Sequence, residues 1–150
     1  MLETTCLIRR MTAHDLDGVM QVELESFPLP WSKESYLGEL KNSFATYLVC
    51  DLEGEIAGFG GIWVVFEEAH ITNVAIASQY RQRGLGTLLM EKLEAVAREK
   101  RAQRILLEVR TSNFPAQRMY KNLGFIPTGL RKEYYTDNKE DAIVMTKFLI

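Results

Sequence analysis

The chain of 150 residues has few of the residues that form metal centres or disulfide frameworks. It holds two cysteines, Cys6 and Cys50, and two histidines, His14 and His70, with no ligand-like spacing among them. We therefore expect no metal, and we interpret both cysteines as small core residues of strands in a reducing compartment, not as a disulfide. His14 is predicted to lie exposed in an early polar turn, and His70 to flank a strand.

Excess charge and long apolar runs are also absent. A net charge of −2 gives no electrostatic footprint for nucleic acid. No apolar run approaches the roughly 20 residues of a membrane span, and the beginning of the chain has no signal-peptide pattern. We expect a cytoplasmic protein without direct nucleic-acid or membrane partners. With 47% hydrophobic residues, the chain is long enough for one domain, residues 1–150, with a real core.

Two common phosphate-binding loops are missing as well. There is no Gly-x-x-x-x-Gly-Lys-Ser/Thr, and the pair Gly84 and Gly86 lacks the third glycine of a dinucleotide fingerprint. The pair nevertheless stands between a strand-like segment, 71–76, and an amphipathic helical pattern. Free N–H groups at such a junction suit a phosphorylated cofactor, and Arg81 and Arg83 add positive charge. The alternative is that the glycines only permit a tight turn and close helix packing.

The pattern of apolar and turn residues predicts an α/β (α+β) sandwich, a mixed sheet flanked by helices. Helices are expected from the Thr12–Asp15 capping box, from Ser32 to about Lys41, over 84–100, and from Pro115 to Gly124. The first helix is expected to bury Leu16, Val19, Leu24 and Phe27. Strands are expected over 5–10, 44–51, 56–66, 71–76, 105–109, 125–134 and 142–148, with 67–69 as a separator.

Two polar side chains stand in apolar surroundings. Glu108 shares one strand face with Leu106 and Arg110, so it is either solvent-facing or held in a cleft, where poor solvation raises the pKa of its carboxyl toward that of a general base. An ion pair with Arg110 or Arg104 is the alternative. Tyr120 lies on the apolar stripe of its helix, either as a core residue or as a weak acid. Together with the phosphate loop, this pair fits acyl transfer to an amine.

These residues resemble the GNAT acetyltransferases. The segment 81–86 is similar to their acetyl-CoA pyrophosphate loop, and 107–125 (LEVRTSNFPAQRMYKNLGF) is similar to their second signature. Within the family, the likeness is to the RimI type, which acetylates the N-terminal alanine of a small-subunit ribosomal protein. It rests on Phe27, Pro30-Trp31-Ser32, 73–76, Arg131, Tyr134-Tyr135 and 140–145. The chain departs from the family at Arg81, Ile76 and Phe114-Pro115.

The resemblance implies a mostly antiparallel sheet with splayed central strands, and a role for each residue. Glu108 is the expected general base and Tyr120 the general acid. The residues expected to bind acetyl-CoA are Val74, Ala75, Ile76, Gln82, Arg83, Gly84, Leu85, Gly86, Thr87 and Asn113. Backbone groups of Val74 and Ile76 are expected to pair with the pantetheine arm, and an N–H in the same segment is expected to polarise the thioester carbonyl.

The expected partner is the N-terminus of a ribosomal protein or a similar peptide. Trp31, Tyr134 and Tyr135 are candidates for lining its slot, although Trp31 could instead only plug the loop after the first helix. Two alternatives remain at this point. One is acetylation of another amine, such as a lysine side chain, a polyamine or a small molecule. The other is a non-catalytic acyl-CoA-binding module.

Overall fold

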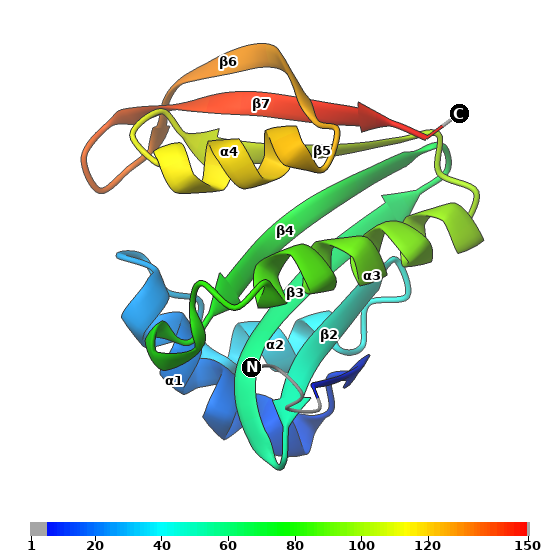
Figure 1. The fold of residues 1–150 in the computed structure, drawn as a ribbon, viewed down its shortest axis with the longest axis vertical. Coiled ribbons are helices and arrows are strands. Elements are labelled where there is room, and N and C mark those ends of the chain that lie inside the picture. Colours follow the sequence, from blue (N-terminus) through cyan, green and yellow to red (C-terminus); the bar gives the residue numbers. More distant parts are fainter. Residues whose placement is uncertain (1–5, 150) are drawn as a thin grey trace.

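The computed structural model, which describes residues 6–149, contains one seven-stranded mixed sheet with helices on both faces (Figure 1). This confirms the predicted fold class. The strand order is β1-β2-β3-β4-β5-β7-β6, and only β4 and β5 pair in parallel. The strands are β1 (Leu7–Arg10), β2 (Ala45–Leu52), β3 (Glu55–Val65), β4 (Glu68–Ile76), β5 (Arg104–Arg110), β6 (Ile126–Tyr135) and β7 (Glu140–Phe148). The helices are α1 (Leu16–Ser26), α2 (Lys33–Glu39), α3 (Leu85–Glu99) and α4 (Phe114–Asn122).

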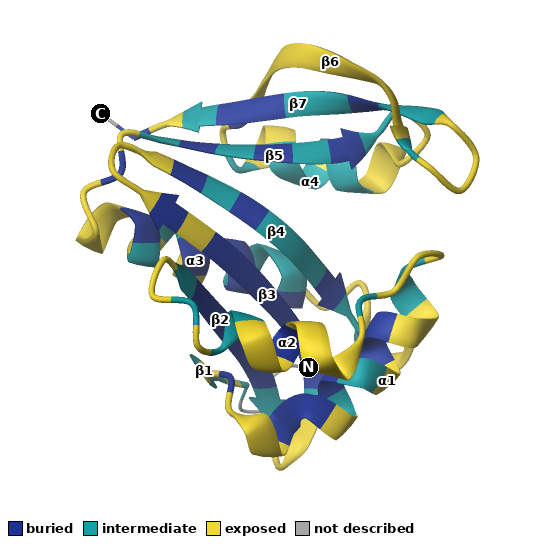
Figure 2. Cartoon of the chain, turned by 180° about the vertical axis from the view of Figure 1, so that it is seen from behind, coloured by how far each residue is buried: buried dark blue, intermediate teal, exposed yellow. Residues whose placement is uncertain are grey.

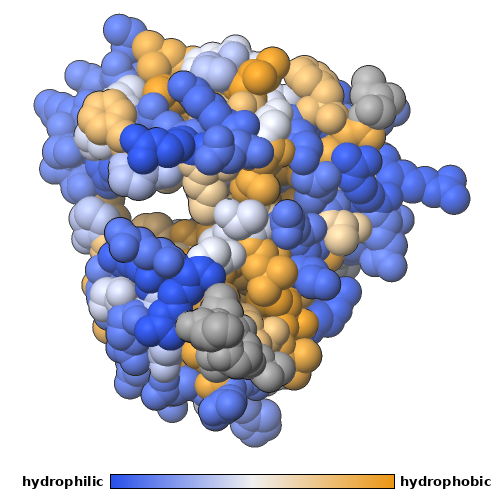
Figure 3. All heavy atoms as spheres, in the orientation of Figure 1, coloured by the Kyte–Doolittle hydropathy of each residue, from blue (hydrophilic) through white to orange (hydrophobic). Residues whose placement is uncertain are grey.

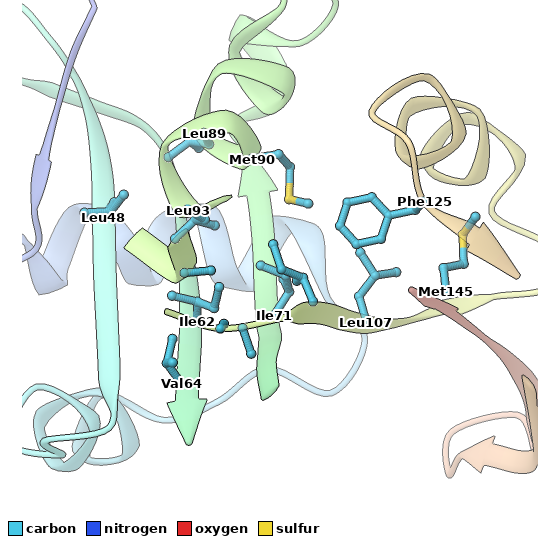
Figure 4. Close-up of a cluster of buried hydrophobic side chains, with 14 of the residues drawn as sticks. Leu48, Ile62, Val64, Ile71, Leu89, Met90, Leu93, Leu107, Phe125 and Met145 are labelled. Carbon is cyan, nitrogen blue, oxygen red and sulfur yellow. The ribbon is translucent and has the colours of Figure 1, made fainter. Parts of the chain in front are cut away.

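Two apolar clusters hold the helices against the sheet. On one face Leu89 and Leu93 of α3 pack with Ile62 and Ile71 of the central strands, as Figure 4 shows. On the other face α1 and α2 supply a second cluster, which includes Leu16, Val19, Tyr36, Val49 and Phe59. The middle parts of β2 and β3 are buried on both faces between these two layers, and β6 is exposed along most of its length (Figure 2).

The helix starts follow the capping signals of the sequence. The Thr12 N–H donates to Asp15 Oδ2 at 2.7 Å, and this capping box begins a short 3₁₀ turn, Ala13–Asp15, that leads into α1. Ser32 Oγ accepts the N–H of Ser35 at 3.1 Å at the start of α2. The prediction for Leu24 was wrong, because this residue lies five positions after Val19, round the helix from the apolar stripe, and its side chain is 63% exposed.

Two other predictions need correction, and a third concerns a residue outside the described range. Cys6 and Cys50 form a disulfide with their Cα atoms 6.1 Å apart, because the antiparallel pairing of β1 with β2 brings distant parts of the chain together. The segment 67–69 is not a separator, since β4 begins at Glu68, opposite Val65. Thr5, the expected first residue of the first strand, lies outside the described residues. Within 6–149, no helix has both the length and the apolarity needed to cross a bilayer.

The central strands β4 and β5 separate soon after they meet. They pair only at Glu68–Arg104, Ala69–Ile105 and His70–Leu106. Beyond His70, a register shift in the β3–β4 pairing leaves Thr72 as the extra residue of a bulge, and bulges bend and twist a strand. From there on the two strands diverge (Figure 2). Among the described residues, no strand pairs with one edge of β4 from Asn73 to Ile76, as the splayed-strand prediction required.

Candidate active site

A cavity of about 630 Å³ lies where the two strands diverge. It is lined by residues from the loop between α1 and α2, from β4 and β5, from α4 and from the end of β6. Figure 3 shows an opening through the molecule between the part that carries α4 and β6 and the part that carries α1. Seven of the predicted site residues line this cavity, namely Glu108, Tyr120, Val74, Asn113, Trp31, Tyr134 and Tyr135. The sheet and the helices thus gather groups that are far apart in the sequence.

Glu108 is a nearly buried carboxylate with two partners. Its Oε1 lies 2.7 Å from His70 Nε2, and its Oε2 accepts a hydrogen bond from Arg131 Nε at 3.2 Å. Burial raises the pKa of the Glu108 carboxyl, but the hydrogen bonds and charges of His70 and Arg131 outweigh burial and hold that pKa below its ordinary value. The expectation of a raised pKa was therefore wrong, since sequence reasoning found the desolvation but neither partner.

The predicted ion-pair partners of Glu108 bind elsewhere. Arg104 Nε contacts Glu68 at 3.2 Å, and Arg110 contacts Glu140 at 3.2 Å. The Ser112 N–H donates to Glu140 at 2.7 Å, and the side-chain and backbone hydrogen bonds of Ser112 lower the pKa of the Glu140 carboxyl to about 2. These contacts fix the segment between β5 and α4 that carries Asn113. Asn113 itself caps α4 by accepting the Ala116 N–H at 3.2 Å.

Tyr120 occupies the expected helix face, beside Phe125 at a ring-centroid distance of 5.9 Å. Burial raises the pKa of its hydroxyl to about 12. Its hydroxyl makes no hydrogen bond with any group in residues 6–149, although the residue lines the cavity. A phenol in this setting stays protonated at neutral pH and can donate to a ligand atom.

Aromatic rings form the walls of the cavity near Glu108. Tyr134 and Tyr135 lie edge to face with centroids 5.1 Å apart, and Arg110 stacks on Tyr135 at 4.0 Å. Trp31 both lines the cavity and packs against Tyr36 at 5.2 Å. Both interpretations of Trp31, slot lining and loop plug, therefore agree with its position.

Sequence reasoning missed a buried polar network beneath this wall. Glu23 of α1 is 1% exposed, and it accepts hydrogen bonds from Tyr36 Oη at 2.5 Å and from the Trp31 N–H at 2.8 Å. Asn73 Nδ2 donates to Tyr36 Oη at 2.6 Å. Burial raises the pKa of the Glu23 carboxyl. A glutamate on the apolar stripe of α1, one helical turn after Val19, was the signal that could have revealed this network.

The glycine pair lies at the start of α3 and does not line the cavity. Gly84 precedes the helix with φ +80°, and a Cβ on Gly86 would lie 3.1 Å from Met119 Sδ and 3.9 Å from Ile76 Cγ1. The first helical hydrogen bond runs from the Leu88 N–H to the Gly84 oxygen, so the N–H groups of 85–87 have no intrahelical partner. The pair makes a tight turn, and the phosphate role of Gln82, Arg83, Leu85 and Thr87 stays a prediction.

Along the free edge of β4, the Ile76 oxygen accepts a hydrogen bond from Arg81 Nε at 2.9 Å. The side chain of Ala75 belongs to the apolar cluster beneath α1, so only its backbone can contribute to the edge. Val74 lines the cavity, and the pairing of the Val74 and Ile76 backbone with pantetheine stays a prediction.

Comparison of the chain with known proteins identifies its family. The profile of the acetyltransferase (GNAT) family matches residues 16–125. A Bacillus subtilis protein called putative [ribosomal protein bS18]-alanine N-acetyltransferase is 46% identical over 145 residues, which cover 96% of each chain.

Two solved structures have the same fold. The ribosomal-protein-S18-alanine N-acetyltransferase of Escherichia coli is 30% identical with a TM-score of 0.88, covering 96% of this chain and 94% of that one. A GNAT family acetyltransferase from Elizabethkingia anophelis with acetyl-CoA bound is 23% identical with a TM-score of 0.79, covering 96% and 98%.

Proposed function

Since the chain belongs to the GNAT acetyltransferase family and is an N-acetyltransferase with acetyl-CoA as co-substrate, we propose that it acetylates the α-amino group of the N-terminal alanine of a small-subunit ribosomal protein. One observation carries the assignment of chemistry. A carboxylate and a phenol, Glu108 and Tyr120, line one cavity beside the free edge of β4. The whole-chain likeness to the Bacillus subtilis protein supports the acceptor.

In the proposed mechanism Glu108 removes a proton from the acceptor. A peptide α-ammonium has a pKa of about 7.7–8.0, so little assistance is needed near neutral pH. The ionised carboxylate of Glu108 takes the proton directly or through water, and the free amine attacks the thioester carbon. A new C–N bond forms while the C–S bond breaks. Backbone N–H groups of the segment from Val74 to Ile76 stabilise the negative charge on the carbonyl oxygen.

Tyr120 completes the reaction by donating its phenolic proton to the departing thiolate. The conjugate thiol has a pKa near ~8.5 by analogy with cysteine, whereas burial raises the pKa of Tyr120 to about 12. That mismatch makes donation to a free thiolate uphill, so Tyr120 donates its proton while the C–S bond breaks and negative charge develops on the sulfur. The acceptor nitrogen enters as an ammonium and loses two protons, one to Glu108 before the attack and one as the C–N bond forms. One proton ends on the thiol and the other reaches solvent, Tyr120 returns to its protonated form, and no covalent enzyme intermediate is needed.

The remaining site residues bind the two substrates. The free N–H groups at the start of α3, with Arg83, suit the pyrophosphate, because a helix N-terminus carries partial positive charge. Asn113 is proposed to hydrogen-bond the cofactor arm. Trp31, Tyr134 and Tyr135 are proposed to enclose a small first side chain of the acceptor, which excludes water from the amine.

The test is thiol release from acetyl-CoA with two matched peptides. One has a free N-terminal alanine and no lysine, and the other has a blocked N-terminus and one internal lysine. The proposal expects turnover with the first peptide only. Turnover with the second peptide alone would keep the fold and the co-substrate but overturn the acceptor, and silence on both would direct the search to small-molecule amines.

A further inference from the structure

The part of the cavity wall that carries Tyr135 is not fixed by regular strand pairing. Arg131 of β6 pairs with Ala142 of β7, and the next pair is Tyr135 with Glu140. Between these two pairs β6 advances four residues and β7 only two, so β6 carries a bulge there. Tyr135 is also the last residue of β6 before the turn to β7. The irregular ladder therefore does not by itself fix the position of the Tyr135 ring.

Arg110 of β5 holds this ring. Its guanidinium carbon lies over the Tyr135 ring, 4.0 Å from the centroid, within the range of a cation–π contact. Tyr134 also contacts the ring, but it lies in the same bulge and is 45% exposed. Arg110 comes from β5, which pairs with β7 without a register shift from Arg104 to Arg110. Arg110 is thus the contact that joins the Tyr135 ring to the regularly paired part of the sheet.

The guanidinium of Arg110 presents its flat face to the ring because its edges are occupied. Nη2 donates to both carboxylate oxygens of Asp137 at 3.1 Å, and Nη1 donates to Glu140 Oε1 at 3.2 Å. The Arg110 side chain is 20% exposed, and the two carboxylates compensate its charge. A lysine ammonium is a point charge without a flat face, so the same combination of contacts requires arginine.

Other groups hold the side of the cavity where the cofactor arm is expected. Gln117 Nε2 donates to the backbone oxygens of Arg110 and Thr111 at 2.9 and 3.0 Å. The Asn113 N–H donates to the Arg110 backbone oxygen at 3.0 Å. None of these hydrogen bonds uses the Arg110 side chain. Replacing that side chain therefore leaves the segment that carries Asn113 in place and changes the wall at Tyr135.

We propose that Arg110 is a positioning residue for the acceptor, because it holds the Tyr135 ring at the wall of the slot that takes the first acceptor residue. This inference rests on the proposed function, in which Tyr135 belongs to that slot. It adds that acceptor binding depends on the planar guanidinium of Arg110, while the binding of acetyl-CoA and the chemical step do not.

The experiment uses the peptide that has a free N-terminal alanine and no lysine. It measures kcat and the acceptor KM at saturating acetyl-CoA, and the dissociation constant of coenzyme A by calorimetric titration. We expect Arg110→Met, which keeps the aliphatic stem and removes the planar cation, to raise the acceptor KM by about 5- to 30-fold. Both kcat and the coenzyme A dissociation constant should stay within about 2-fold, because Tyr135 is expected to bind the acceptor without touching the reacting atoms.

A double-mutant cycle shows whether Arg110 acts through Tyr135. Tyr135→Leu alone should also raise the acceptor KM. Arg110→Met added to Tyr135→Leu should raise it further by less than about 2-fold, because the contact is already lost. An equally large effect of Arg110→Met with and without Tyr135 would overturn the proposal.

Arg110→Lys covers the case in which the unpaired carboxylates of Asp137 and Glu140 prevent Arg110→Met from folding. This variant keeps a positive charge beside both carboxylates but has no flat face for the ring. We expect its acceptor KM to rise and its kcat to stay near that of the wild type. A wild-type acceptor KM in Arg110→Lys would show that only the charge matters and would also overturn the proposal.

Arg98→Met is the matched control. It removes one arginine ion pair, that with Glu94 at 3.0 Å on α3, and Arg98 does not line the cavity. The acceptor KM and the coenzyme A dissociation constant should both be unchanged in this variant.

An equal loss of acceptor and coenzyme A binding in Arg110→Met would make Arg110 a structural residue only, and would overturn the inference while the proposed function stands. If the wild-type enzyme does not acetylate the peptide with the free N-terminal alanine, the proposed function fails first and the inference fails with it.

Discussion

His70 Nε2 lies 2.7 Å from Glu108 Oε1, at the point where β4 and β5 stop pairing. His70 belongs to the last residue pair of the two strands, and Glu108 is two residues beyond that pair on β5. The contact therefore joins β4 to β5 at the narrow end of the gap between them and holds the carboxylate at the cavity. It makes His70 a positioning residue for the proposed base.

The first prediction concerns the pH dependence of this pair. In the wild type, His70 and Arg131 hold the pKa of Glu108 below its ordinary value, so Glu108 stays ionised from pH 5 upward. The acid limb of kcat/KM should therefore follow the acceptor α-ammonium, with an apparent pKa of about 7.7–8.0. His70→Ala removes one of the lowering contacts and raises the pKa of Glu108, so its loss of kcat/KM should be larger at pH 5.5 than at pH 8.5. A loss of equal size at both pH values would make His70 a structural residue only.

The second prediction separates chemistry from binding. Glu108→Gln and Tyr120→Phe should each lower kcat with a free N-terminal peptide by about 10²–10⁴-fold. The dissociation constant of acetyl-CoA should stay within about 2-fold, since neither side chain contacts the expected pyrophosphate loop. Single-turnover kinetics and calorimetric titration measure the two quantities. Wild-type turnover in both variants would refute the two catalytic roles.

The third prediction tests the two interpretations of the glycine pair. Gly84 has φ +80°, so Gly84→Ala should lower the free energy of unfolding by about 1 kcal/mol. Gly86→Ala meets only the flexible end of Met119 at 3.1 Å and should cost less stability, but its methyl group stands at the start of α3, where the pyrophosphate is expected. We expect Gly86→Ala to weaken coenzyme A binding by at least about 10-fold, which is a change of about 1.4 kcal/mol. Unchanged affinity in both variants would leave the glycines with a turn and packing role alone.

The fourth prediction concerns the buried network. Tyr36→Phe removes the hydroxyl that donates to Glu23 and accepts from Asn73, so the buried Glu23 and the half-buried Asn73 each lose a partner. The expected loss in the free energy of unfolding is about 1–3 kcal/mol, measured by urea denaturation. Tyr134→Phe serves as the control, because Tyr134 is 45% exposed and its hydroxyl makes no hydrogen bond within residues 6–149. Equal stability of the two variants would contradict the importance of this network.

The fifth prediction is the acid sensitivity of the start of α1. Arg9 donates two hydrogen bonds of 2.9 Å to Asp15, and this contact lowers the pKa of the Asp15 carboxyl from 3.8 to about 2. A lowered folded-state pKa means that the stabilisation is present above about pH 4 and is lost as the pH falls toward 2. Asp15→Asn should lower the free energy of unfolding at pH 7 by about 2 kcal/mol. The difference between variant and wild type should shrink between pH 4 and pH 2.

The opposite sign applies to Glu23, whose folded-state pKa is raised by burial. Its contribution favours the folded protein below the ordinary carboxyl pKa and is lost as the pH rises through the folded-state value. The comparison of Asp15→Asn with the wild type isolates the Asp15 contribution, because Glu23 is the same in both. A difference that persists unchanged at pH 2 would show that Asp15 acts through packing and not through its charge.

Local signals predicted most of the secondary structure. Ser32 caps α2 and Pro115 lies in the first turn of α4, as expected, and Gly84 precedes α3 in the left-handed conformation that only glycine adopts freely. The alternation around Glu108 was also confirmed, with its neighbours Leu107 and Val109 buried on the other face. These features depend on residues a few positions apart, so the sequence contains them directly.

Tertiary structure alone decided which distant groups meet. His70 reaches Glu108 because β4 pairs with β5 up to His70, and Arg131 reaches it because β6 folds back beside β7. Those two contacts reverse the expected direction of the pKa shift of Glu108. The Cys6–Cys50 disulfide and the Glu23–Tyr36 contact likewise join segments whose separation along the chain carries no information about their separation in space. The sequence by itself determined the elements, their caps and the residues of the proposed chemistry. The pairing and splay of the strands determined the partners of those residues, because the electrostatics of a carboxylate depend on which charges lie within a few ångströms of it.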